Sequence, residues 1–142
     1  MKQFLKIILA SLIFHSCVMD TVYDCKIINN TIDTIHLRIT FDKNYLDKIY
    51  EGQKQKYVSY LKLNIGQDSG VYINDFDTIN LTASYKIIPK VKFTLEHGMS
   101  VPNYFSYKDL TIIAKDTLIF HNKKEISEAF KKNDGDYLIT IN

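Results

Sequence analysis

The chain has 142 residues, of which 18 are basic and 16 are acidic, and 46% of its residues are hydrophobic. This length suits a single domain with a modest hydrophobic core. The formal net charge is only +2 and Arg38 is the only arginine, whereas guanidinium groups are the preferred tool for recognising phosphates and base edges. The composition therefore argues against nucleic acid as a partner.

The first elements are a positive flank and a short apolar run. Lys2 and Lys6 precede the apolar residues 7–14, which are followed by His15, Ser16 and Cys17. A helix needs roughly 20 apolar residues to cross a bilayer, so this run is too short to span one. A positive end, a short apolar middle and a small residue at its end are typical of a secretory signal peptide.

The pair Ser16-Cys17 resembles the lipobox of bacterial lipoproteins, in which the cysteine is lipidated and becomes the first residue of the mature chain. We predict a signal peptide over residues 1–16, lipidated Cys17 with a short tether over 17–24, and a single β-rich domain over 25–142. Two alternatives stay open, namely a buried or amphipathic first helix and a secreted form without lipid.

Processing before Cys17 changes the charge and the cysteine count. The first sixteen positions contain Lys2 and Lys6 but no acidic residue, so the mature chain would hold 16 basic and 16 acidic residues. Lipidation would leave Cys25 as the only free thiol, without a partner for an internal disulfide. Because Cys25 lies in an apolar strand pattern, we expect it to behave as a small buried hydrophobe.

Residues 24–41 predict a β-hairpin, with a turn rich in Asn and Asp between two strands. In the second strand Ile35, Leu37, Ile39 and Phe41 alternate with polar residues, which is the period of a half-buried strand. The polar stretch after this strand lacks the period and predicts a short helix or a structured loop that ends near Gly52.

Strand patterns then return. Alternation over residues 57–65 predicts a strand, and "GQDSG" a turn. Residues 71–73 and 75–87 predict two further strands, the second with Ile79 and Leu81 on its buried face. Pro89 interrupts the pairing, "VKFTL" at 91–95 predicts a strand, and residues 96–103 a loop.

The last third predicts a hairpin, a helix and a final strand. Residues 110–114 and 117–121 flank a tight turn at Lys115-Asp116. Asn122 and Glu125 form a capping box for a helix that ends before Gly135, and residues 137–141 are a strand. About eight short strands with one C-terminal helix before the last strand predict a mainly β fold, an antiparallel β-sandwich or a partly open barrel; a flattened α+β sheet is the alternative.

Four stretches carry a resemblance to known proteins: "HSC", "CKIINNTIDTIHLRITFD", "KIIPKVKFTL" and "DTLIFHNKKEISEAFKKNDGDYLITIN". The chain resembles the small uncharacterised lipoproteins of Gram-negative envelopes. This resemblance implies a place in the cell envelope and a β-rich domain. It transfers no functional residue beyond Cys17.

No motif of catalysis or metal binding stands out. His36, His97 and His121 form neither HxH nor HExxH, the patterns of zinc sites. Ser69, Ser100 and Ser106 lie outside GxSxG and SxxK, the patterns of nucleophilic serines. We therefore expect no enzymatic activity, no metal and no cofactor.

Two weaker patterns suggest surface sites. The triplet Asp-Thr-aliphatic resembles an acceptor pattern of periplasmic O-glycosylation and marks Thr34, Thr78 and Thr117, although Asp followed by Thr also begins strands. Tyr104, Phe105 and Tyr107 follow a proline loop and suggest an exposed aromatic contact surface, unless two of the three belong to the core.

Together these features predict a lipid-anchored protein of the cell envelope, held at the outer or inner membrane, that binds another protein without catalysis. An accessory subunit or an immunity-type protein fits this description. The alternatives are a lipoprotein that binds a small ligand or glycan, and a periplasmic hydrolase whose site the sequence does not reveal.

Overall fold

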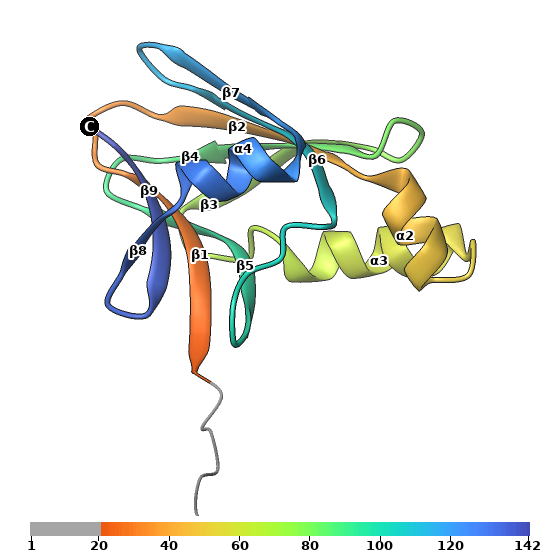
Figure 1. Ribbon diagram of the computed structural model, residues 1–142. Helices are drawn as coiled ribbons and strands as arrows, with labels where there is room; N and C mark the ends of the chain where they lie inside the picture. The colour runs from red at the N-terminus through yellow and green to blue at the C-terminus, as the bar shows by residue number, and fades with distance from the viewer. Residues whose placement is uncertain (1–20) are drawn as a thin grey trace, which may run out of the picture.

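The computed structural model describes residues 21–142, which form two β-sheets and three helices (Figure 1). The fold is mainly β and not a closed barrel, as the sequence predicted. The strands are β1 Val22–Asn29, β2 Ile35–Phe41, β3 Val71–Asp77, β4 Thr82–Ile87, β5 Lys92–Met99, β6 Tyr107–Ile113, β7 Thr117–His121, β8 Lys131–Asn133 and β9 Asp136–Ile141. The helices are α2 Lys43–Ile49, α3 Lys54–Asn64 and α4 Asn122–Ala129.

The sheets enclose one core. The first sheet has the order β5-β1-β9-β8 and the second has the order β3-β4-β2-β6-β7. All pairs are antiparallel except β1 and β9. The predicted alternation in β2 is confirmed, because Ile35, Leu37, Ile39 and Phe41 are buried. Tyr85 of β4 meets Phe93 of β5 at 4.9 Å between ring centroids, so the inner faces of the two sheets pack on each other.

The predicted hairpin over 24–41 is wrong in its pairing. β1 pairs with β5 and β9, whereas β2 pairs with β4 and β6, so the turn between them carries the chain from one sheet to the other. Asn29 ends β1 inside the core, and its side-chain amide donates to the carbonyls of Asp33 at 2.8 Å and Ile87 at 3.0 Å. A turn-rich sequence shows that the chain reverses, but not which strand lies beside which.

The predicted strand over 57–65 is also wrong, because these residues belong to α3 and the turn after it. Tyr57, Leu61 and Ile65 are buried. They are four residues apart, a spacing that fits one face of a strand and one face of a helix equally. Leu63 would share their face in a strand, but it is 72% exposed.

Two further boundaries differ from prediction. Residues 75–87 are not one strand, since a turn separates β3 from β4 and leaves Ile79 79% exposed. The Asp77 carboxylate accepts hydrogen bonds from the backbone N–H groups of Ile79 and Asn80 at 2.7 and 3.0 Å, and these bonds form the turn. β5 extends to Met99 through residues predicted as a loop, and the short β8 was not predicted.

The tight hairpin, the start of the late helix and the burial of Cys25 agree with prediction. β6 and β7 form the hairpin around Lys115 and Asp116. α4 begins at Asn122, but the predicted capping box is only partly formed: the Asn122 side-chain oxygen accepts from the backbone N–H of Glu125 at 3.3 Å, whereas the Glu125 carboxylate accepts from the backbone N–H of His121, the N-cap, at 2.7 Å. Cys25 is fully buried.

Candidate functional site

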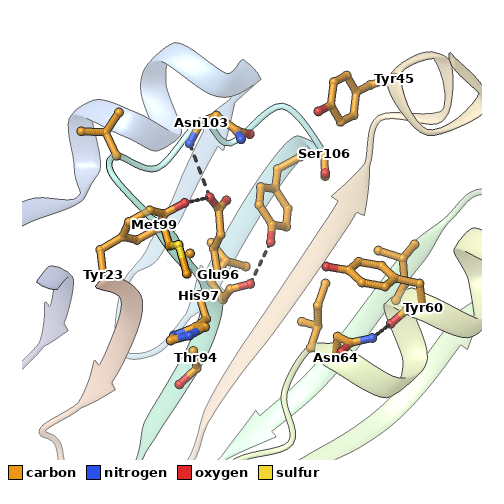
Figure 2. A pocket seen from close by; sticks show the side chains of 16 residues that line it. Tyr23, Tyr45, Tyr60, Asn64, Thr94, Glu96, His97, Met99, Asn103 and Ser106 are labelled. Atoms are coloured by element: carbon orange, nitrogen blue, oxygen red, sulfur yellow. Dashed lines mark hydrogen bonds between the residues drawn. The ribbon is translucent and has the colours of Figure 1, made fainter. Parts of the chain in front are cut away.

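A groove of about 520 Å³ lies between β5 and α3 (Figure 2). The second half of β5 forms one wall, and Tyr60 and Asn64 of α3 form the opposite wall. Tyr45 of α2 closes one end. Leu61 and Leu95 are buried beneath it, so an apolar base carries aromatic and polar walls.

The wall formed by β5 is the edge of its sheet. β5 pairs with β1 on one side, and no strand within residues 21–142 lies on the other. The backbone N–H of Ser100 donates to the carbonyl of Thr21 at 2.9 Å, which continues the pairing of Val22 with Met99. Since alternate residues face the partner in an antiparallel ladder, His97 and Met99 direct their backbone N–H and C=O groups away from β1, toward the groove side.

The first half of the same edge is occupied within the protein. The backbone N–H of Thr94 donates to the Asp68 carboxylate at 2.6 Å, and the carbonyl of Leu95 accepts from the Tyr107 hydroxyl at 2.8 Å. Both bonds satisfy backbone groups that an edge strand otherwise exposes. The edge available to another chain is therefore confined to His97 and Met99.

Glu96 is fixed at the groove wall. Its carboxylate accepts from the Tyr23 hydroxyl at 2.6 Å and from the backbone N–H of Asn103 at 3.4 Å (Figure 2). Burial and the bond to Glu96 raise the pKa of Tyr23 well above its usual range, so the hydroxyl keeps its proton and stays a donor. This bond joins β1 to β5 and holds the acidic group in place.

Behind the groove, charged residues cross the outer face of three strands. Nδ1 of His97 lies 2.5 Å from Asp24, and Lys26 bridges Asp24 at 2.6 Å and Asp136 at 2.8 Å. The hydrogen bond from Lys26 and, to a smaller extent, the one from His97 lower the pKa of the Asp24 carboxyl group. These bonds tie β5, β1 and β9 together and stiffen the strand that carries the free edge.

The predicted aromatic surface is wrong for two of its three residues. Tyr104 and Tyr107 are only 2% and 6% exposed and belong to the core, where the Tyr104 ring packs against Phe130 and the ring of Tyr107, at the start of β6, packs against Phe41. Phe105 is 43% exposed and stacks on Tyr45 at 5.5 Å between ring centroids. The Nζ of Lys123 lies 3.4 Å from the centre of the Phe105 ring.

Phe105 and Tyr45 thus extend the groove. Tyr45 borders both the groove and a neighbouring hollow lined by Phe105, Lys123 and Lys124. The sequence did not indicate Tyr45, because it falls in the polar stretch after β2, which predicted only a short helix or a structured loop. Tyr60 was hidden by the wrong strand assignment, and a helical period over 54–64 would have placed it beside Asn64 on the same side of α3.

The remaining predicted residues do not meet at one site. His36 is exposed on β2, and His121 pairs with Asp109 at 2.9 Å. Within residues 21–142 no three His, Cys, Asp or Glu side chains are grouped as a metal site requires, and no helix there is long and apolar enough to cross a membrane. Thr34 and Thr117 are exposed and Thr78 is half-buried, while Cys17 lies outside the described residues. Lipidation and glycosylation stay predictions.

Comparisons of the chain with protein families, with curated proteins and with solved structures gave no match. A function for this chain is therefore inferred from the geometry of the groove and from the free edge of β5.

Proposed function

We propose that this protein is a lipid-anchored protein of the cell envelope that binds an extended segment of another protein along β5, without catalysis. The observation that carries the proposal is the unpaired edge at His97 and Met99, which lies beside a groove with aromatic walls. The apolar run ending in Ser16-Cys17 supports the anchor. An accessory subunit or an immunity-type protein would use such a site.

Strand addition supplies both affinity and selectivity. The outward N–H and C=O groups of His97 and Met99 offer up to four main-chain hydrogen bonds, each worth about 0.5–1.5 kcal/mol net. Together they supply about 2–6 kcal/mol, less than the roughly 8 kcal/mol of a micromolar complex. Alternate side chains of the segment must therefore bury apolar area against Tyr45 and Tyr60, which selects the sequence that binds.

The side chains of the groove walls favour one second candidate function, which is glycan binding. Tyr45, Tyr60, Asn64 and Glu96 combine aromatic faces with polar groups, which also suits a glycan. A glycan would use the side chains of the walls and would not need the main chain of β5. The two candidates therefore differ in their dependence on the backbone N–H groups.

The test selects binders from a displayed library of random twelve-residue peptides. It then measures the affinity of the selected peptides for two variants of the protein that are substituted at Met99. Met99→Pro removes an outward N–H without removing a bond to β1, and Met99→Ala keeps that N–H but shortens the side chain. We expect Met99→Pro to weaken binding at least fivefold, because a carbonyl of the bound segment left without its donor costs about 1–3 kcal/mol, and Met99→Ala to weaken it by less than threefold. Circular dichroism and thermal unfolding verify that both variants fold.

Equal affinities for the two variants would contradict strand addition. Binding on a glycan array that Met99→Pro leaves intact and Tyr60→Ala abolishes would favour the second candidate. Amide chemical shifts of the complex add a site-specific readout, since strand addition must perturb His97 and Met99 more strongly than residues of β8 at the opposite edge of the sheet.

A further inference from the structure

Three exposed apolar side chains gather where β1 begins and β5 ends. Val22 is 55% exposed, Met99 68% and Val101 65%. Val22 and Met99 are direct partners in the β1–β5 pairing, and the hydrogen bond from Ser100 to Thr21 holds the start of the next loop against the start of β1. Figure 1 shows both chain segments at the same end of the molecule. We call residues 21–22 and 98–103 the tip.

The tip contains no charged residue, since its sequence is "TV" and "GMSVPN". Two acidic groups adjoin the tip: Asp20 precedes Thr21 in the sequence, and the Glu96 carboxylate accepts from the backbone N–H of Asn103 at 3.4 Å. Along β1 and β5, Asp24 and His97 are two residues back from Val22 and Met99. At about 3.3 Å per residue, they lie roughly 7 Å behind the end of the sheet. A surface that enters the headgroup region, which is roughly 6 Å deep on each side of a bilayer, would leave Asp24 and His97 at the level of water.

The length of chain before β1 determines what covers the tip. Cys17 precedes Val22 by five residues, and an extended chain reaches at most about 3.5 Å per residue. A lipid on Cys17 therefore lies no more than roughly 17 Å from Val22. A protein tethered so closely holds this end at the bilayer surface, where apolar side chains gain free energy by leaving water.

We propose that the tip contacts the bilayer beside the lipid of Cys17 and fixes the orientation of the domain. This inference rests on the anchor in the proposed function. The uncharged tip fits a zwitterionic surface and has no requirement for anionic lipid. Because Met99 and Val101 also line the groove, this orientation places one end of the groove next to the membrane, where it receives a segment of a membrane-associated partner.

The absence of tryptophan from the sequence allows a clean test. Val101→Trp places a single reporter in the tip, and Ile32→Trp places one at the opposite end of β1, where Ile32 is 85% exposed. Each full-length variant is expressed in a Gram-negative host, its acylation is verified by intact mass, and it is reconstituted into phosphatidylcholine vesicles with and without phosphatidylglycerol. Emission spectra and quenching by brominated lipid are recorded for both.

We expect the emission of Val101→Trp to shift to shorter wavelength on vesicles of either composition and to be quenched by brominated lipid, with Ile32→Trp unchanged. Acylated protein that floats with vesicles but shows no shift and no quenching at Val101→Trp would overturn the tip contact and leave the anchor intact. Protein without acyl chains would overturn both the anchor and the tip contact that rests on it. Circular dichroism of each variant verifies the fold.

Discussion

Asn29 provides the sharpest test of how the two sheets are joined. Its side chain is fully buried at the end of β1 and donates to the carbonyls of Asp33 and Ile87 at 2.8 and 3.0 Å. Its side-chain oxygen accepts from the backbone N–H and hydroxyl of Thr31 at 3.1 and 2.7 Å. Asn29→Ala removes all four bonds, which connect β1 to β4 and shape the turn between the sheets.

The loss of stability in Asn29→Ala depends on how deeply each of these hydrogen bonds is buried. Each bond from the amide to a carbonyl contributes about 1–1.5 kcal/mol, and the bonds to the more exposed Thr31 add about 0.5 kcal/mol together. We therefore expect Asn29→Ala to lower the free energy of unfolding by about 3 kcal/mol, a large part of the 5–15 kcal/mol typical of a domain. At roughly 4 °C per kcal/mol, the melting temperature falls by about 12 °C.

Urea unfolding of Cys17→Ser protein, which cannot be acylated, measures this loss. The free energy of unfolding should keep the same slope against urea concentration in each variant. Asn30→Ala is the matched control, since the exposed Asn30 side chain makes one bond, 3.3 Å long, to Asn142, and the change should cost less than about 0.5 kcal/mol. A loss for Asn29→Ala no larger than that of the control would refute the view that Asn29 couples the sheets.

Three more predictions concern the core and its charged face. Gly66 has φ +69°, and an added Cβ there would lie 2.6 Å from the Tyr85 ring, whereas a Cβ at Gly52 (φ +72°) would meet nothing within 4 Å. Gly66→Ala should therefore lower the free energy of unfolding by about 3 kcal/mol and Gly52→Ala by about 1 kcal/mol. Equal urea midpoints for the two variants would contradict this expectation. The pKa values of Asp24 and Asp136 are lowered, so their bonds give stability that is present above their ordinary value near 3.8 and is lost as pH falls through the lowered values. Lys26→Met should therefore flatten the decline in urea midpoint between pH 5 and pH 2, and an unchanged slope would argue against this reasoning. Burial raises the pKa of the Cys25 thiol to about 12, so in Cys17→Ser protein a disulfide reagent should modify it only on unfolding; rapid reaction of the folded protein would show that β1 opens.

The sequence predicted the fold class and most strands because a half-buried strand leaves a period of two in the chain. β2 shows this most clearly, with four buried residues at alternate positions. The period failed at α3, since Tyr57, Leu61 and Ile65 satisfy a helix as well as a strand. It also could not show that β1 and β2 lie in different sheets, because pairing depends on β4, β5 and β9, which are distant in sequence.

The candidate site was mostly beyond sequence reasoning. A free strand edge is a property of sheet order, and no residue type marks the outward N–H groups of His97 and Met99. Tyr104 and Phe105 are adjacent in the sequence, yet one is buried and the other exposed, because the loop between β5 and β6 turns Tyr104 inward with φ 51°. The aromatic composition predicted a contact surface, but only the fold selects Phe105 and adds Tyr45 and Tyr60.

The proposed anchor at Cys17 would place the β5 groove at a membrane, so the intact mass of the protein from a Gram-negative host is the most direct test of the proposed function as a whole. It is measured in separated membrane and soluble fractions, beside Cys17→Ala. We expect a chain that begins at Cys17, carries acyl groups and is found in membranes, with processing lost in Cys17→Ala. A soluble chain that begins at Met1 without acyl groups would contradict the proposed function.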